Sequence, residues 1–105
     1  MAYEIEITEG AEAELEAKRA FDHRRLLEAI EEQLVDQPTV ETRNRKNLGD
    51  GMTADFEYVS PLWELRVGDF RVFYAVDHAV GVVIVHAVRE KPPGKTTAEV
   101  LNARS

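Results

Sequence analysis

Apolar and polar residues alternate most informatively between Pro61 and Tyr74, and the pattern predicts a tight β-hairpin. Gly68 and Asp69 are the expected loop residues, because glycine tolerates the positive φ angle that a two-residue turn requires. Arg66 then lies opposite Arg71 across the hairpin. One hairpin face is apolar and should meet the core; it carries Trp63, Leu65, Val67, Phe70, Val72, Tyr74 and Val76. The other face carries Leu62, Glu64, Arg66, Arg71 and Phe73.

The N-terminal third is predicted to form one strand and two helices. Residues 2–8 alternate as a half-buried strand does, and Thr8 is the expected N-cap of a helix over Glu9–Lys18. Asp22 is the expected cap of a second helix, which should run roughly from His23 to Val35. These two helices should form an antiparallel hairpin.

The remaining segments are expected to complete a sheet. Thr39–Thr53 is polar, and a short strand is predicted near Ala54–Val59. Val82–Val88 is apolar almost throughout, which is typical of a strand covered on both faces near the centre of a sheet. Thr96 or Thr97 should cap a last helical turn. The sequence therefore predicts one α+β domain over residues 1–105, with the first strand and helical hairpin packed on a mainly antiparallel sheet of four or five strands.

The composition and motifs of the chain argue against several classes of protein, including disulfide-bonded, membrane-spanning, secreted and metal-binding proteins. The chain of 105 residues has no cysteine, so it has no disulfide and no thiolate metal site. It has no apolar run that would span a bilayer and no secretion signal, so we expect a cytoplasmic protein without a membrane partner. No histidine and carboxylate spacing suggests a metal site, no phosphate-binding glycine loop is present, and we expect no cofactor.

Charge is unevenly distributed along the chain. Residues 1–42 hold twelve acids and four bases, a net charge of −8, whereas residues 43–105 hold eight acids and nine bases, a net charge of +1. The total of −7 argues against a simple nucleic-acid-binding protein. The second half is therefore the only part of the chain suited to face an anion. The alternative explanation of the asymmetry is that the first half is a well-solvated helical face, and both can hold together.

The stretch LWELRVGDFRVFYAVD, from Leu62 to Asp77, resembles the signature hairpin of the RelE/ParE family of bacterial type II toxins. The order of the other predicted elements is similar to that family over nearly the whole chain. This resemblance implies a cognate antitoxin as partner, and it leaves a homodimer open. It also implies one of two activities, either metal-independent cleavage of mRNA on the ribosome or inhibition of DNA gyrase.

The resemblance also implies site residues. Arg71 matches the family arginine that contacts the scissile phosphate, and Arg66 matches another commonly basic hairpin position. The RelE-type enzymes place lysines at the positions of Leu62 and Glu64, and this chain has neither. Arg89 or Lys91 could supply the basic residue that follows the last strand. The late tyrosine or histidine of the family is absent, since Pro92, Pro93 and Gly94 stand there.

Metal-free RNA cleavage needs a base, cations around the phosphate and an acid. Arg66 and Arg71 suit the cation role, because guanidinium stays charged and can bind phosphate through two donors. Glu64 is either a general base or the neutralising partner of the arginines. Lys91 is a candidate acid. His86 titrates in a useful range, but a regular strand would put it on the face opposite Arg89, and a core position is the alternative.

Arg43, Arg45 and Lys46 form a candidate RNA-backbone contact together with Arg89, and the alternative is an ordinary polar surface. Trp63 and Tyr74 could stack on bases, but their positions on the core face favour packing. The first hypothesis is thus a ribosome-dependent endoribonuclease with catalytic Arg66, Arg71, Glu64 and Lys91, acting on mRNA. The second is a toxin-fold protein without nuclease activity, either a gyrase inhibitor or an antitoxin-binding module.

Overall fold

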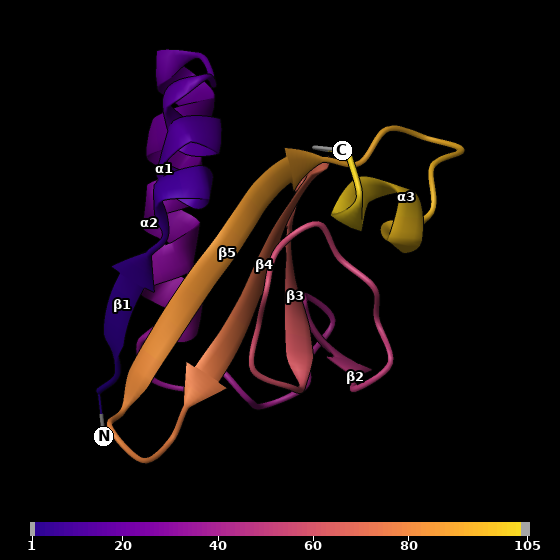
Figure 1. The fold of residues 1–105 in the computed structure, drawn as a ribbon. Coiled ribbons are helices and arrows are strands. Elements are labelled where there is room, and N and C mark those ends of the chain that lie inside the picture. Colours follow the sequence, from indigo (N-terminus) through magenta and orange to yellow (C-terminus); the bar gives the residue numbers. More distant parts are fainter. Residues whose placement is uncertain (1, 104–105) are drawn as a thin grey trace.

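A computed structural model describes residues 2–103 of the chain. Five strands form one sheet in the order β1-β5-β4-β3-β2. The strands are β1 (Glu4–Ile7), β2 (Arg45–Gly49), β3 (Leu62–Val67), β4 (Phe70–Asp77) and β5 (Val82–Glu90). β1 pairs with β5 in parallel, and the other neighbours are antiparallel. The predicted α+β class and the mainly antiparallel sheet are confirmed, and Figure 1 shows β5 running through the middle of the molecule.

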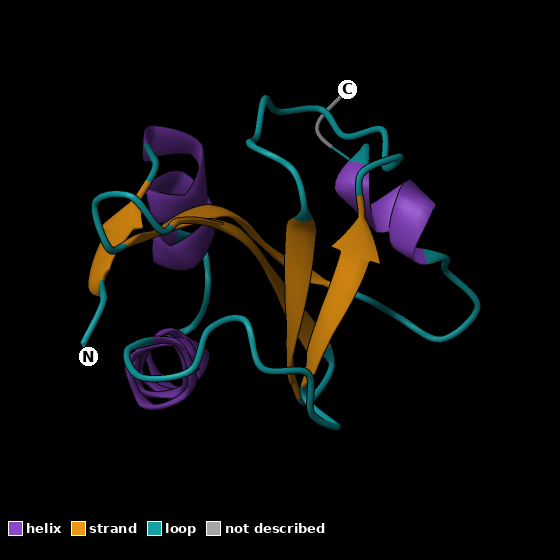
Figure 2. Cartoon of the chain, turned by 90° about the horizontal axis from the view of Figure 1, so that it is seen from below, coloured by secondary structure: helices purple, strands orange, loops and turns teal. Residues whose placement is uncertain are grey.

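The helices lie on both sides of this sheet. The helices α1 (Glu9–Glu16) and α2 (Ala20–Leu34) form the predicted hairpin against one face, and the short α3 (Thr97–Leu101) lies against the other (Figure 2). Within the described residues, no helix is long and apolar enough to cross a membrane.

The helix caps follow the sequence in two of three cases. The Thr8 hydroxyl accepts a hydrogen bond from the Ala11 amide and caps α1 as predicted, and Thr96 caps α3. The prediction that Asp22 caps the second helix is wrong. α2 already begins at Ala20 after Arg19, and Asp22 lies in its first turn, where its carboxylate contacts the Arg19 guanidinium at 3.7 Å. An acid there is favourable at a helix N-terminus, so the residue type suits either position.

The β3–β4 hairpin has the predicted register. Val67 pairs with Phe70, Arg66 with Arg71, and Trp63 with Tyr74, so Gly68 and Asp69 are the loop residues. Gly68 has a φ of +58°, in the left-handed region that glycine occupies at little cost. The apolar hairpin face packs under α1 and α2 with Leu15, Leu26, Ile30 and Leu34 from the helices and Val83, Val85 and Val88 from β5.

The opposite hairpin face is also covered, which the sequence did not predict. Leu62 and Phe73 are fully buried there with Ala87, beneath Val100 and Leu101 of α3. The predicted strand near Ala54–Val59 is not formed. Instead, Met52, Ala54, Phe56 and Tyr58 of the 52–58 segment pack against the same cluster. The missed strand is β2, whose polar residues Arg45 to Gly49 pair with β3. Backbone pairing there depends on the neighbouring strand rather than on local strand propensity.

β5 contains a β-bulge at His86. Tyr74 of β4 pairs with Val85, whereas the preceding Phe73 pairs with Ala87, so His86 is an extra residue on β5. Beyond it the alternation is inverted, and Arg89 lies on the α3 face rather than beneath the helical hairpin. The expectation that His86 and Arg89 point to opposite faces is therefore wrong. The His86 ring stacks on Phe56 with centroids 5.2 Å apart, and the Arg89 guanidinium lies 5.7 Å from the same ring.

Candidate functional site

Three arginines lie in one row across the α3 face of the sheet. Arg66 of β3 pairs with Arg71 of β4, and Arg71 pairs with Arg89 of β5. Directly paired residues on adjacent strands share a face, so we call this row the arginine row. It contains three of the predicted site residues and lies at the end of the sheet that carries the hairpin turn. Whether the row can bind a phosphate depends on which groups each guanidinium already contacts.

Arg66 contacts a buried carboxylate. Its Nε lies 3.6 Å from Oε1 of Glu64 on the same strand, and the Arg66 side chain is 46% exposed whereas that of Glu64 is 2% exposed. The second oxygen of Glu64 accepts a long hydrogen bond of 3.4 Å from the Thr97 hydroxyl of α3. Glu64 therefore serves as the partner of Arg66 and of α3 in this structure, which is the neutralising alternative of the sequence analysis.

Arg71 turns back onto its own hairpin. Its Nη1 donates to the main-chain carbonyls of Gly68 at 2.9 Å and Phe70 at 2.8 Å. Its Nε is buried and has no hydrogen-bond partner among the residues that the structure describes. Arg71 thus uses Nη1 to stabilise the main chain of the turn. In the described part of the chain, no carboxylate lies within ion-pair distance of its guanidinium.

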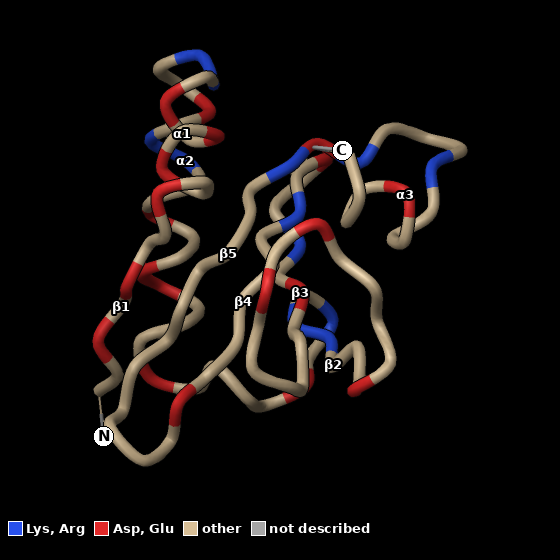
Figure 3. Tube along the Cα trace, viewed as in Figure 1, with Lys and Arg blue, Asp and Glu red and all other residues tan. Residues whose placement is uncertain are grey.

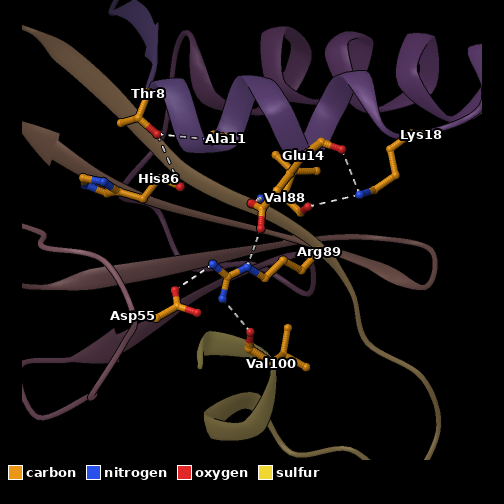
Figure 4. A network of polar contacts seen from close by, with 9 residues as sticks. All are labelled: Thr8, Ala11, Glu14, Lys18, Asp55, His86, Val88, Arg89 and Val100. Atoms are coloured by element: carbon orange, nitrogen blue, oxygen red, sulfur yellow. Dashed lines mark hydrogen bonds and ion pairs between the residues drawn. The ribbon is translucent and has the colours of Figure 1, made fainter. Parts of the chain in front are cut away.

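Arg89 is held in a buried network (Figure 4). Its Nε donates to Glu14 at 2.8 Å, its Nη2 to Asp55 at 2.7 Å and its Nη1 to the Val100 carbonyl at 2.7 Å. Its side chain is only 5% exposed. Burial lowers the pKa of Arg89, but the hydrogen bonds and charges of Asp55 and Glu14 outweigh that effect and the pKa is raised. This guanidinium is permanently charged and joins α1, β5, the 52–58 segment and α3.

The charges at the arginine row are balanced. Arg66, Arg71 and Arg89 contribute +3, and their immediate surroundings add the carboxylates of Glu64, Glu14 and Asp55, which contribute −3. A cradle for a phosphoryl transition state needs cationic donors that are not already engaged by carboxylates. The row therefore offers a phosphate much less positive potential than three arginines alone would give.

The four other predicted site residues differ in their exposure. Arg43 and Lys46 are exposed, and Lys46 of β2 pairs with Glu64 at the edge of the row. Arg45 is buried, and its guanidinium donates to the Val40 carbonyl and to both carbonyl oxygens of Gln33. Lys91 directly follows β5, and its amide donates to the Asp69 carbonyl at 2.7 Å. Arg45 is thus a structural anchor for the loop before β2.

Sequence reasoning missed the basic end of the helical hairpin (Figure 3). All four bases of residues 1–42 lie between positions 18 and 25. A cleft of about 470 Å³ separates this end from the β3–β4 turn, and its lining comprises Ala17, Lys18, Arg19, Asp22, Arg25, Asp69, Phe70 and Glu90. Three bases and three acids line it, so the cleft has no net charge. The clustering of bases in an acidic segment was the available sequence signal.

Within residues 2–103, no group of three or more histidine, aspartate or glutamate side chains is arranged to hold a metal ion.

Trp63 and Tyr74 stack on each other in the core with ring centroids 6.2 Å apart, and both are buried. They are core residues, as the alternation of the hairpin indicated.

Comparisons with known folds agree with this architecture. The isolated RelE toxin of E. coli has 18% sequence identity and a TM-score of 0.66, with 93% of this chain and 94% of that chain covered. The RelE-RelB complex of Pyrococcus horikoshii contains a chain with 26% identity and a TM-score of 0.67, over 91% of this chain and 100% of that one. The RelBE2 toxin-antitoxin complex of Mycobacterium tuberculosis gives 18% identity and a TM-score of 0.67, over 87% and 100%.

The sequence comparison is more specific than the fold comparison. Among functionally curated proteins, no significant sequence match is found. The sequence profile described as the ParE toxin of type II toxin-antitoxin system, parDE, matches residues 5–91, which contain β2 to β5, the helical hairpin and all of β1 except its first residue. The chain therefore belongs to the ParE toxin family, within the wider RelE/ParE group of type II toxins.

Proposed function

We propose that this chain is a type II toxin that acts by binding its target rather than by cleaving RNA, with DNA gyrase as the target class and a cognate antitoxin as its inhibitor. The observation that carries this proposal is the network in which Arg89 is bound by Glu14 and Asp55. In this arrangement the residue that would serve a nuclease is a structural cation.

The surroundings of the arginine row support the same choice. Leu62 stands where the nuclease-type relatives carry a lysine, and it is fully buried beneath α3. Glu64 stands at the second lysine position and is bound to Arg66. The Glu64 side chain is only 2% exposed, so a substrate hydroxyl would have little access to this carboxylate. The family profile that matches is also that of ParE toxins.

The experiment compares growth, RNA and DNA after induction in bacteria. We expect the wild-type chain to arrest growth, to leave mRNA on translating ribosomes intact and to induce the DNA-damage response. Purified protein should inhibit supercoiling by gyrase. Arg71→Ala should retain most of this effect, and Arg43→Ala, an exposed residue outside the row, serves as the matched control.

Cleavage of mRNA at the ribosomal A site that disappears in Arg71→Ala would instead establish the endoribonuclease hypothesis.

Antitoxin pairing is tested in the same strains. Solved relatives of this fold include complexes with RelB antitoxins. Co-expression of the small protein encoded beside this gene should restore growth and co-purify with the chain.

A further inference from the structure

The basic end of the helical hairpin, residues 18–25, carries an exposed aromatic side chain. Phe21 lies in the first turn of α2 and is 69% exposed. The buried residues that attach α2 to the core are Leu26, Ile30 and Leu34, so the Phe21 ring adds little to the packing of the fold. Figure 1 shows the junction of α1 and α2 projecting beyond the ends of the strands. The ring therefore lies at a convex end of the molecule, where it can enter a concave surface of another molecule.

Two arginines lie beside this ring. Arg24 and Arg25 follow Phe21 by three and four positions, and residues at these spacings are neighbours on a helix surface. Both are exposed, and within residues 2–103 neither has a carboxylate within ion-pair distance. Aromatic residues and arginine are the side chains enriched at protein interfaces. The phenyl ring and the two guanidinium groups form a patch of this composition.

Arg25 is held in place by the β3–β4 turn. A Cβ added at Gly68 would lie 2.2 Å from Nη2 of Arg25, so the guanidinium lies directly against the glycine of the turn. A side chain that is ordered before binding loses less conformational entropy when a partner binds. The turn thus presents Arg25 in a fixed position, one helical turn from Phe21.

The charges around the patch select an acidic partner. Of the twelve acids in residues 1–42, only Asp22 lies between positions 18 and 25, and its carboxylate is 3.7 Å from Arg19. The remaining eleven acids lie in β1, in the bodies of the two helices and in the loop that follows α2. An acidic surface is therefore attracted to the basic end and repelled by the rest of the N-terminal third, which orients the encounter.

We propose that Phe21, Arg24 and Arg25 form the surface by which the chain binds its target protein. The phenyl ring fills an apolar pocket of the target, and the two guanidinium groups pair with carboxylates at the rim of that pocket. The inference rests on the proposed function, because it names the contact surface for the protein that the toxin inhibits. This surface lies on α2, apart from the arginine row on the α3 face of the sheet.

A nucleic acid fits the patch less well. Backbone binding requires several cations that neutralise successive phosphates, whereas two of the four bases at this end are already engaged. Arg19 contacts Asp22, and the Lys18 Nζ donates to two main-chain carbonyls at 3.0 and 3.4 Å. The net charge of −7 also repels a polyanion. The two remaining guanidinium groups are better matched to the few carboxylates of a protein pocket.

The test measures the binding of purified gyrase to variants of the full chain by surface plasmon resonance. Phe21→Ala and Arg24→Glu should each weaken binding at least about tenfold. Val80→Ala removes an equally exposed apolar side chain from the β4–β5 turn, and Lys95→Glu makes the same charge change at another exposed position. Both controls should bind as the wild type does. Added salt should weaken the wild type more than Arg24→Glu. Thermal unfolding of the four variants should match that of the wild type, because all four side chains are exposed.

A photocrosslinking residue tests the contact directly. Phe21→p-benzoylphenylalanine should crosslink to gyrase within a peptide that contains carboxylates. Val80→p-benzoylphenylalanine, at an equally exposed position, should not crosslink.

Unchanged gyrase binding in both Phe21→Ala and Arg24→Glu, or a crosslink from position 80 alone, overturns this inference and leaves the proposed function intact. Binding of the wild type to a short DNA duplex without gyrase, lost in Arg24→Glu, also overturns it, because the occupant is then a nucleic acid. A wild-type chain that neither binds nor inhibits gyrase overturns the proposed function and this inference with it.

Discussion

Asp55 Oδ1 accepts a hydrogen bond of 2.7 Å from Nη2 of Arg89, and this contact fixes the segment before β3 to the end of β5. Because Glu14 binds the same guanidinium at 2.8 Å, one buried cation connects three parts of the chain that are distant in sequence. This relationship decides the function proposed for the arginine row, and it also predicts how the fold responds to mutation.

Arg89→Met should destabilise the protein by about 3 to 5 kcal/mol, because removal of one partner from a buried ionic network leaves the remaining charges uncompensated. Urea denaturation measures the change. Arg66→Met, which removes a 46% exposed arginine, should cost less than about 1 kcal/mol. Equal losses in the two variants would show that the Arg89 network contributes no more than a surface ion pair.

Gly68→Ala should destabilise the β3–β4 hairpin. The residue has a φ of +58°, and an added Cβ would lie 2.2 Å from Nη2 of Arg25. The left-handed backbone alone costs an alanine about 1 to 2 kcal/mol, and the Arg25 side chain must also move. Thermal unfolding measures both contributions if Gly68→Ala is compared with Gly68→Ala/Arg25→Ala. Gly51→Ala is the control, because nothing lies within 4 Å of the added Cβ; a similar loss there would contradict the explanation.

Tyr74 should make the protein sensitive to alkaline pH. Its hydroxyl donates to the Pro38 carbonyl at 2.6 Å, and burial raises its pKa well above 10.0 despite the opposing charge of Arg45. The unfolded chain loses this proton near pH 10 whereas the folded chain keeps it, so stability falls as pH rises above 10. Tyr74→Phe should be about 1 kcal/mol less stable at pH 7, from the lost hydrogen bond.

The decisive comparison for Tyr74 is the slope of unfolding free energy between pH 9 and 11, measured by urea titration. Tyr74→Phe should show a shallower slope than the wild type, since Tyr3 and Tyr58 are present in both proteins. Identical slopes would mean that Tyr74 is not the group responsible.

Thr96→Ala should loosen α3. Thr96 and Glu99 form a capping box, and an N-cap substitution of this kind costs about 1 kcal/mol. The hydrogen bonds of Thr96 lower the pKa of Glu99 below 4.5, helped by Lys95. This stabilisation is present above pH 4.5 and is lost as pH falls through the lowered pKa. The protection of the Val100 and Leu101 amides, taken relative to the intrinsic exchange rate at each pH, should fall in Thr96→Ala and, in the wild type, at acidic pH; Lys95→Ala should change this protection little.

The hairpin was predictable to the residue because its register depends on local information. A glycine in a two-residue turn and the alternation on both sides determine every pair from Val67–Phe70 to Trp63–Tyr74. β2 was not predictable, because Arg45 to Gly49 lacks the branched and aromatic residues that signal a strand. Its pairing arises from β3, which is distant in sequence.

The three arginines of the row were named from the sequence, but their contacts were not. The family resemblance indicated Arg66, Arg71 and either Arg89 or Lys91, and the structure places the three arginines in one row. Nothing in the sequence pairs Asp55 or Glu14 with Arg89, because ion pairs between distant residues leave no periodic pattern. Arg45 was expected to contact RNA, yet its guanidinium is enclosed by Gln33 and Val40.

The extra residue at His86 changes the parity of β5. Without it, strict alternation would turn Arg89 toward the apolar space under α1 and α2, where Asp55 and Val100 could not reach it. If one residue were deleted at this point, the side chains in the last third of β5 would each move to the other face of the sheet: those now under α3 would point toward α1 and α2, and the reverse. A single inserted position thus assigns the charged end of β5 to one side of the protein, and homologous sequences that lack it would need a different arrangement of the same side chains.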